Sequence, residues 1–355
     1  MRFFPGLPLL LFSTGSVARN IVFPPIHEVT GQASLSNDGV ADDIDIVTGS
    51  QFSGLSTFAH VPYVNCFIDG EAEKEKYDIA ILGAPFDTAV TARPGARYGP
   101  GGIRRGSARM RAGSAWSVYS GQLDKAHKVV SSRIANTTDV SSVPRIITLG
   151  GDHTTTLSAL RSTYEKWGPV SVVHFDSHID TWDPEVLGGG VSSYAGVNHG
   201  TFLHIAHEEG LVQNNSIHVG IRAPLVREKG DLRNDVRCGF DIVTARDIDM
   251  IGASGIIEKI KNRVGSDNVY ISVDIDVLDP AFAPATGTAE PGGFSTRELL
   301  TILDGLSGLR VIGGDVVEVA PVYDTTGETT VLAAAEVANS LLGLMIAKPV
   351  PNERK

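Results

Sequence analysis

The sequence predicts an α/β fold in which a mostly parallel central sheet of about seven to eight strands carries helices on both faces. Short apolar runs rich in Val and Ile recur along the chain, as in parallel strands that are buried on both faces. Segments with a helical spacing of apolar residues lie between these runs, as crossover helices lie between parallel strands. At 355 residues with 42% hydrophobic content, the chain can bury one large core.

The expected elements follow one another from residue 77. We predict strands at 77–83, around 146–149, and at 171–176, 216–221, 240–244, 269–275 and 310–317. We predict helices near 103–110, after His153, and at 255–264, 296–305 and 329–347. Ser295 with Glu298 forms a capping box at the start of the helix 296–305. The long Gly/Pro-rich loop between Arg93 and Pro100 follows a strand, where long loops commonly line a site.

The N-terminus is typical of a targeting segment. Arg2 precedes an apolar run, and Ser16-Val17-Ala18 is a small-x-small cleavage site, so we expect residues 1–18 to be a secretory signal. A mitochondrial presequence or a cytoplasmic protein are the alternatives. Residues 19–60 predict a polar N-terminal arm, and residues 61–350 predict a single domain.

Composition limits the class of partner. A net charge of −11 and a pI of about 5.4 argue against nucleic acid or an anionic membrane and suit a small cationic substrate. Export would permit glycosylation at Asn136 or Asn214. Cys66 and Cys238 are too few for a disulfide framework, and the sequence leaves their pairing open.

The segment from His174 to Asp180 indicates a metal site. It follows the predicted strand 171–176, and open α/β sheets bind ligands at the carboxyl ends of their strands. In extended chain, residues two apart point the same way, so Asp176, His178 and Asp180 can converge on one spot. Two carboxylates and an imidazole on one face are suitable ligands for a metal ion.

Two further segments add ligands of the same kind. Asp274 and Asp276 follow the apolar run 269–273, and Gly150-Gly151-Asp152-His153 follows the run at 146–147. Four carboxylates cannot all stay ionised within a few ångströms of one another without a counter-charge, which two divalent cations would supply. Each acid alone could simply cap a strand or a turn. Six such residues in three motifs make that explanation improbable.

Together these motifs resemble the signatures of the ureohydrolases, the arginase and agmatinase superfamily. The motifs are Gly150-Gly151-Asp152-His153, Phe175-Asp176-Ser177-His178-Ile179-Asp180, and Ser272-Val273-Asp274-Ile275-Asp276-Val277-Leu278-Asp279-Pro280. The resemblance runs from about residue 53 to 347. The segments Gly83-Ala84-Pro85-Phe86-Asp87, Arg93-Pro94-Gly95-Ala96-Arg97 and Val317-Glu318-Val319-Ala320-Pro321 are closer to agmatinases than to true arginases.

The resemblance implies a three-layer α/β/α fold, a pair of Mn²⁺ ions and a homo-oligomer, either a trimer or a hexamer. It assigns one ion to His153, Asp176, Asp180 and Asp274, and the other to His178, Asp176, Asp274 and Asp276. It also makes His199 the general acid for the leaving amine and Glu318 the acid that binds the guanidinium nitrogens. Asp152 and Asp279 are expected either to orient ligands or to have a merely structural role. The expected reaction is hydrolysis of a linear guanidino compound, agmatine first, to urea and an amine such as putrescine.

Several alternatives remain open at the level of sequence. A guanidinobutyrase, or another guanidino-acid hydrolase of the same family, would use the same motifs. A deacetylase with this fold would hold one Zn²⁺ through Asp176, His178 and Asp274 alone, and a catalytically inert relative would release no urea. Six histidines lie outside the motifs and have no expected role: His27, His60, His127, His204, His207 and His218.

The chain departs from the family pattern in three places. Ser177 stands where alanine is usual, and Thr154 where serine is frequent. Agmatinase relatives carry a further edge strand in the interval 111–144, and we find no such strand signal here. An edge strand can be lost with only one ladder of hydrogen bonds, so the expected ligands stay in place.

Overall fold

The computed structural model describes residues 56–65, 77–110, 144–188, 192 and 195–350. All of these residues belong to one compact unit, Gly49–Lys355. The predicted signal (1–18), most of the arm (19–60) and the interval 111–143 lie outside the described residues. The domain boundaries and the localisation therefore stay predictions, as do the missing edge strand, glycosylation at Asn136 and any pairing of Cys66.

The sheet has seven described strands, and every pairing between them is parallel. Their order across the sheet is β1-β2-β7-β6-β3-β4-β5. The strands are β1 (Ile79–Ala84), β2 (Arg145–Gly150), β3 (Ser171–Phe175), β4 (Ser216–Ile221), β5 (Phe240–Thr244), β6 (Asn268–Asp274) and β7 (Arg310–Val317). The predicted parallel sheet and its strand positions are confirmed.

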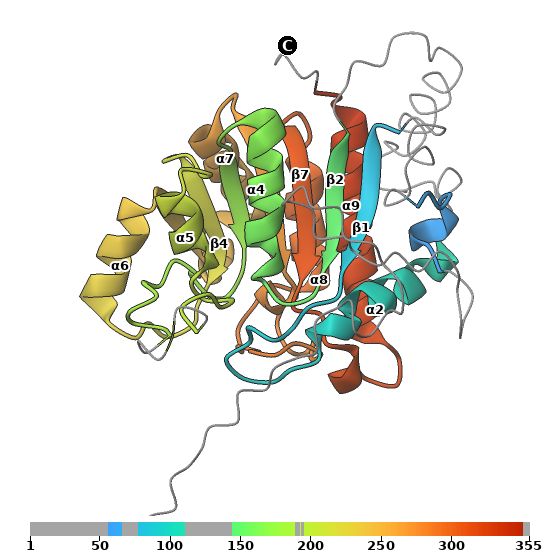
Figure 1. Cartoon of the computed structure of the whole chain (residues 1–355), viewed down its shortest axis with the longest axis horizontal. Coiled ribbons are helices and arrows are strands. Elements are labelled where there is room, and N and C mark those ends of the chain that lie inside the picture. Colours follow the sequence, from blue (N-terminus) through green and yellow to red (C-terminus); the bar gives the residue numbers. More distant parts are fainter. Residues whose placement is uncertain (1–55, 66–76, 111–143, 189–191, 193–194, 351–355) are drawn as a thin grey trace, which may run out of the picture. The chain divides into compact units, whose positions relative to one another are not determined.

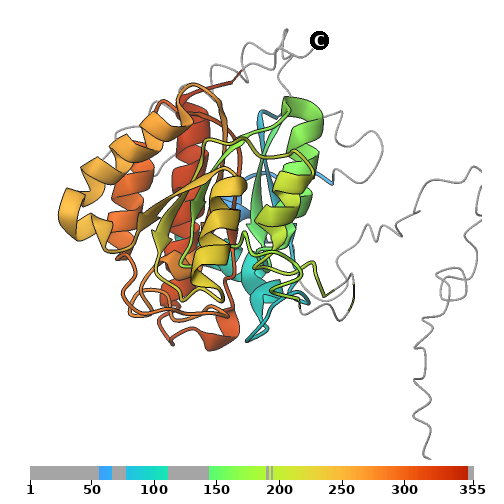
Figure 2. The ribbon, with the colours of Figure 1, turned by 90° about the vertical axis from the view of Figure 1, so that its left-hand side faces the viewer.

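Helices cover both faces of the sheet, which gives the predicted three layers. The view along the sheet in Figure 2 places α4 and α5 on one face, and α7, α8 and α9 on the other. The helices are α2 (Gly99–Gly106), α4 (Thr155–Trp167), α5 (Phe202–Glu208), α6 (Glu228–Arg237), α7 (Asp247–Val264), α8 (Thr296–Gly305) and α9 (Thr329–Ala347). Short 3₁₀ turns are η1 (Phe58–His60), η2 (Ala96–Tyr98), η3 (Ser107–Arg109), η4 (Ile275–Val277) and η5 (Pro321–Tyr323).

Local sequence explains where these helices begin. The capping box predicted for α8 is present: the Ser295 hydroxyl accepts from the backbone of Glu298, whose carboxylate accepts from the backbone of Ser295. Helix α2 starts earlier than predicted because Pro100 favours the first helical turn. Helix α7 also starts earlier, since residues 247–251 form a helical segment that the kink at Gly252, with φ of 66°, separates from the apolar part.

The core lies on both faces of the central strands. Val173 on β3, Ile271 on β6 and Val316 on β7 are fully buried, as expected for strands that are covered on two sides. Helix α9 is apolar and long enough to span a membrane by length and composition, but it packs against β7, α8 and α2, and ten of its residues are buried. In this structure α9 is therefore a core helix.

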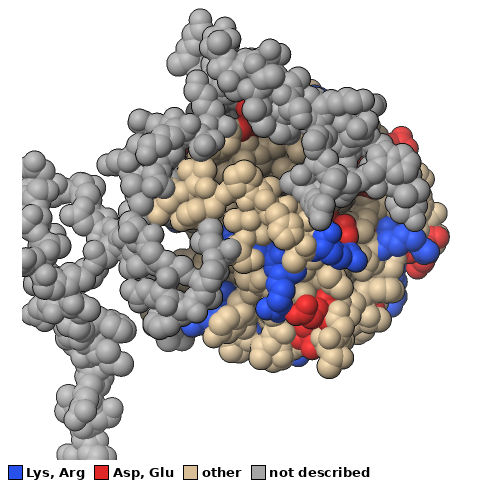
Figure 3. Space-filling model, turned by 90° about the vertical axis from the view of Figure 1, so that its right-hand side faces the viewer, with Lys and Arg blue, Asp and Glu red and all other residues tan. Residues whose placement is uncertain are grey.

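On the side of the molecule near α2, this helix is held against α9 by close packing and by exposed ion pairs. Figure 3 shows basic and acidic side chains next to one another on this side, below a largely uncharged surface. The exposed pairs Arg105–Glu328 and Arg109–Glu336, each with an N–O distance of 2.8 Å, connect α2 and η3 to α9. Exposed pairs of this kind contribute little to stability. Close packing is possible because a Cβ atom at Gly106 would lie 2.5 Å from the backbone oxygen of Val331.

The strand order places the motifs side by side. Strands β2, β7, β6 and β3 are neighbours in the centre of the sheet, and all are parallel, so their carboxyl ends meet at the same edge. Each of the three predicted motifs, and Glu318 as well, follows one of these four strands. The fold therefore brings together residues that are up to 165 positions apart in the chain.

Candidate metal centre

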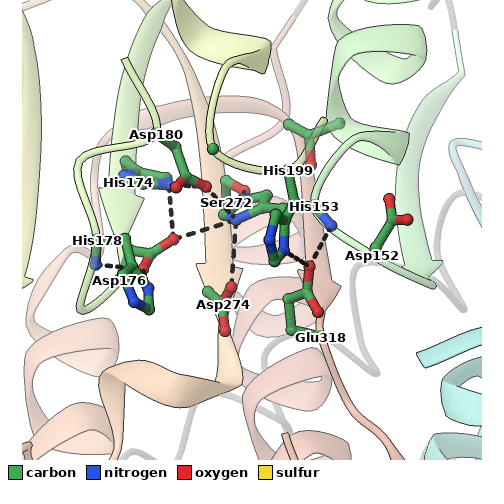
Figure 4. Close-up of polar contacts among 12 residues, drawn as sticks. Asp152, His153, His174, Asp176, His178, Asp180, His199, Ser272, Asp274 and Glu318 are labelled. Carbon is green, nitrogen blue, oxygen red and sulfur yellow. Dashed lines mark hydrogen bonds and ion pairs between the residues drawn. The ribbon is translucent and has the colours of Figure 1, made fainter. Parts of the chain in front are cut away.

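One imidazole nitrogen lies among three carboxylate oxygens. His153 Nδ1 is 3.1 Å from Asp176 Oδ2, 3.1 Å from Asp180 Oδ2 and 3.3 Å from Asp274 Oδ2 (Figure 4). All four side chains are buried. His153 Nδ1 and Asp176 Oδ2 have no hydrogen-bond partner of good geometry among the described residues. This first cluster joins the ends of β2, β3 and β6.

The other nitrogen of His153 determines what faces the carboxylates. The Ser272 hydroxyl donates to Asp315 Oδ1 at 2.7 Å, so its oxygen is left to accept from His153 Nε2 at 2.8 Å. Asp315 also accepts from Tyr270 Oη and is therefore well held. With its proton on Nε2, a neutral His153 presents the lone pair of Nδ1 to the three acids. A lone pair facing three oxygens is stable only if a positive charge lies between them.

A second cluster shares Asp176 with the first. His178 Nδ1 is 3.3 Å from Asp176 Oδ1 and 3.1 Å from Asp276 Oδ2. The two oxygens of Asp176 therefore face the two clusters separately. The His178 side chain is 17% exposed whereas the carboxylates around it are buried, so the centre opens to solvent on the His178 side. The structure thus brings together all six residues that the sequence predicts as ligands.

The pKa values show that the centre attracts positive charge. Burial raises the pKa of Asp274 well above its usual value, and the charges of Asp276 and Asp176 raise it further. Burial and the charge of Asp176 raise the pKa of Asp180 to about 6. Burial alone would lower the pKa of His153, but its contacts with the carboxylates raise it well above the usual value. A proton on Nδ1 could bond only one of the three oxygens, whereas one divalent cation could contact all of them.

The predicted pair His199 and Glu318 lies beside the first cluster (Figure 4). His199 Nδ1 is 2.9 Å from Glu318 Oε1, which also accepts from the backbone of His153 at 2.8 Å. The backbone N–H of Thr91 donates to His199 Nε2 at 3.0 Å, so in this arrangement the His199 proton is on Nδ1. Burial would lower the pKa of His199, but the charge of Glu318 raises it above its usual value. Glu318 Oε2 is buried and has no hydrogen-bond partner among the described residues.

Backbone strain is concentrated at the same place. Asp180 has φ of 50° and Glu318 has φ of 61°, values that residues other than glycine rarely adopt. Such residues cluster at functional sites, where the surrounding structure holds them. The chain after β3 is therefore not extended as far as Asp180, and a turn brings this carboxylate back to His153. Gly151 permits the neighbouring turn, because a Cβ atom there would lie 1.8 Å from the backbone oxygen of Phe86.

Comparison with known proteins identifies the family. The model of the arginase family matches residues 77–343, which is most of the chain. The chain belongs to the arginase family. Membership confirms the predicted resemblance and the predicted enzyme class, a hydrolase that acts on amidino C–N bonds.

Relatives and solved structures agree with this assignment. Putative agmatinase 1 of Schizosaccharomyces pombe is 44% identical, over 90% of this chain and 89% of that one. Proclavaminate amidinohydrolase of Streptomyces clavuligerus is 35% identical, over 84% of this chain and 96% of that one. The crystal structure of a hypothetical agmatinase from Burkholderia thailandensis superposes with a TM-score of 0.65 at 34% identity, covering 83% of this chain and 91% of that one.

Two acids of the family motifs hold loops rather than the clusters. Asp152 accepts from the backbone of Ala89 and of Thr154, both at 3.0 Å, and so attaches the loop after β1 to the end of β2. Burial and the charge of Glu318 raise the pKa of Asp152 to about 6. Asp279 accepts from the backbone of Ala281 and Gly292. The contacts described for both acids hold loops in place, and their orientation of ligands stays a prediction.

Ser177 is not equivalent to the alanine usual in arginase-family chains. Its hydroxyl donates to Asp276 Oδ1 at 2.7 Å, and its backbone N–H donates to the same oxygen at 3.0 Å. Two donors on Oδ1 leave Oδ2 as the oxygen that faces His178. Thr154, the other small departure, lies in the turn that follows β2, where its backbone N–H donates to Asp152.

Sequence reasoning missed Arg222, an arginine side chain that joins the second and third motifs. The Arg222 guanidinium donates to the backbone oxygens of Asp276 at 2.6 Å and of Glu290 at 2.7 Å. The backbone N–H of Arg222 donates to the backbone carbonyl oxygen of Ser177 at 3.0 Å. Arg222 immediately follows β4, so its place at the carboxyl end of a strand was the available signal. In this arginase-family chain it holds the segment of Asp276 against the segment of His178.

We expect Arg222→Lys to lower the free energy of unfolding by about 2–3 kcal/mol, because an ammonium group cannot span the carbonyls that the guanidinium joins. Urea unfolding of the purified chain measures this change. Arg105→Lys is the matched control, since its ion pair is exposed and the change should stay below about 0.5 kcal/mol. Equal effects of the two substitutions would show that Arg222 is an ordinary surface cation.

Proposed function

We propose that this chain is a binuclear manganese amidinohydrolase that cleaves a linear guanidino compound, with agmatine as the first candidate, to urea and an amine. The observation that carries the proposal is the position of His153 Nδ1 among three buried carboxylate oxygens at 3.1–3.3 Å. Ligand atoms about 2.1–2.2 Å from one ion, at right angles to each other, lie about 3 Å apart. The spacing in the first cluster supports a cation there.

The donor set suits Mn²⁺. In our proposal one ion is held by His153, Asp176, Asp180 and Asp274, and the other by His178, Asp176, Asp274 and Asp276. The set has carboxylates and imidazoles and no thiolate, which favours Mn²⁺ over metals that prefer sulfur. Asp176 supports a paired site because its two oxygens face different clusters. When bound, two such cations neutralise the carboxylates and activate a water molecule as the nucleophile.

The protein's own groups have separate tasks in the proposed reaction. Glu318 Oε2, which is buried, accepts hydrogen bonds from the guanidinium and orients its carbon toward the nucleophile. His199 Nδ1 lies 2.9 Å from Glu318 Oε1, and His199 is the group that protonates the leaving amine; the charge of Glu318, which raises the pKa of His199, favours the protonated ring that this role requires. The Thr91 hydroxyl, 2.7 Å from Nε2, holds the ring. The charge of Glu318, which is not a proposed metal ligand, favours a cationic group over a neutral amide.

The identity of the substrate rests on comparison. Relatives over most of the chain carry the names agmatinase and proclavaminate amidinohydrolase. A net charge of −11 favours a substrate with cations at both ends, as agmatine has. A guanidino acid such as 4-guanidinobutyrate or guanidinopropionate is the second candidate, followed by guanidine itself. We further propose that the chain forms a homo-oligomer.

A screen of urea release tests the proposal directly. Agmatine, 4-guanidinobutyrate, guanidinopropionate, guanidine and arginine are each incubated with the protein and Mn²⁺, and urea is measured. We expect agmatine to give the highest kcat/KM, with putrescine as the second product. If only a guanidino acid releases urea, the proposed reaction stands and the substrate is that acid in place of agmatine. No urea from any compound would leave the inert relative as the better description.

We expect Asp276→Ala to abolish turnover and to lower bound Mn²⁺ from two ions to one per chain, because Asp276 belongs to the second cluster only. Metal analysis after gel filtration measures occupancy. Asp249→Ala is the control, since Asp249 is an exposed acid on α7. A fully active and fully loaded Asp276→Ala protein would refute the ligand assignment.

A further inference from the structure

Two buried histidines contact each other behind the first cluster. His174 on β3 and His218 on β4 are paired in the parallel register of the two strands, and neither is exposed. Their Nδ1 atoms are 2.8 Å apart, which is a hydrogen-bond distance. His218 belongs to no motif, and we expected no role for it from the sequence. Burying an imidazole nitrogen without a partner is costly, and among the described residues His174 Nε2 has no hydrogen-bond partner of good geometry.

His218 is held on its far side by an acid from another element. Its Nε2 is 2.9 Å from Asp235 Oδ1 on α6, and that oxygen also accepts from the Thr181 hydroxyl at 2.6 Å. Phe240 stacks on the His218 ring with 4.1 Å between the centroids and 11° between the planes. Because a carboxylate can only accept, His218 Nε2 carries a proton that points to Asp235. The His218 ring is therefore fixed in both position and orientation.

The near side of the pair reaches the candidate metal centre. His174 Nε2 is 3.1 Å from Asp176 Oδ2, the same oxygen that lies 3.1 Å from His153 Nδ1 (Figure 4). It is also 4.0 Å from Asp180 Oδ2. Asp235, His218, His174 and Asp176 thus form a continuous polar chain from α6 to the first cluster.

We propose that His218 and Asp235 are positioning residues of the metal centre, which hold His174 with its Nε2 beside Asp176 Oδ2 at the edge of the first cluster. This inference rests on the proposed function, because it assigns the residues a task toward a bound cation. On the other side of the cluster, Ser272 and Asp315 hold His153 through hydrogen bonds. Groups that support metal ligands commonly change metal affinity 10- to 100-fold when they are removed.

Binding of Mn²⁺ to the full chain, without substrate, tests this role. The EPR signal of free Mn²⁺ is followed during titration of the metal-free protein. We expect His218→Phe to weaken Mn²⁺ binding about 10- to 100-fold, because it keeps a ring beside Phe240 and removes both nitrogens. Cys238→Ala is the matched control, since Cys238 is buried in the same hydrophobic cluster as Phe240 and makes none of the polar contacts described for the pair. It should leave Mn²⁺ affinity unchanged within about twofold.

A second variant keeps the test decisive if His218→Phe does not fold. Asp235→Asn preserves the shape of the side chain and removes the charge that His218 faces, and we expect it to weaken Mn²⁺ binding by at least about threefold. Affinity equal to that of the unmodified chain in either folded variant would overturn the proposal and reduce the pair to core packing. If the unmodified chain binds no Mn²⁺ at all, the proposed function fails together with this inference. Mn²⁺ binding by the unmodified chain, with weaker binding by the variants, supports both the proposed function and the positioning role.

Discussion

Mutual repulsion among buried carboxylates is the constraint on which the rest of this structure depends. Asp176, Asp180 and Asp274 surround one imidazole nitrogen at 3.1–3.3 Å, and Asp276 lies beside the second imidazole. Burial strengthens the repulsion because the local dielectric constant is low. Such a cluster stays ionised only around cations, and its affinity for positive charge is the physical basis of the metal binding that we propose.

The parallel sheet makes this concentration of charge possible. The four central strands end at one edge, so each contributes its polar residues there while the strand itself remains apolar. The backbone around the centre is held by groups that carry no part of the reaction. Arg222 joins the segments of the second and third motifs through carbonyl oxygens, and Asp152 attaches the loop after β1. Contacts that stabilise these loops therefore also hold the residues of the centre in position.

Sequence reasoning succeeded where periodicity alone determines position. The place of Asp176 and His178 at the carboxyl end of β3 predicted that they lie together, and motif spacing placed His153 with them. It failed for residues whose proximity depends on strand order. His218 meets His174 only because β4 lies beside β3, and Asp235 reaches His218 from α6, a helix with too few apolar residues to show a helical period. The left-handed conformation at Asp180 also has no signal in the sequence.

Anomalous diffraction from crystals grown with Mn²⁺ would test the central claim most directly, since it locates cations without reference to activity. We expect two peaks per chain, one beside His153 and one beside His178, with Asp176 in contact with both. A single peak beside His178, or no peak among these carboxylates, would contradict the paired centre and with it the proposed hydrolysis.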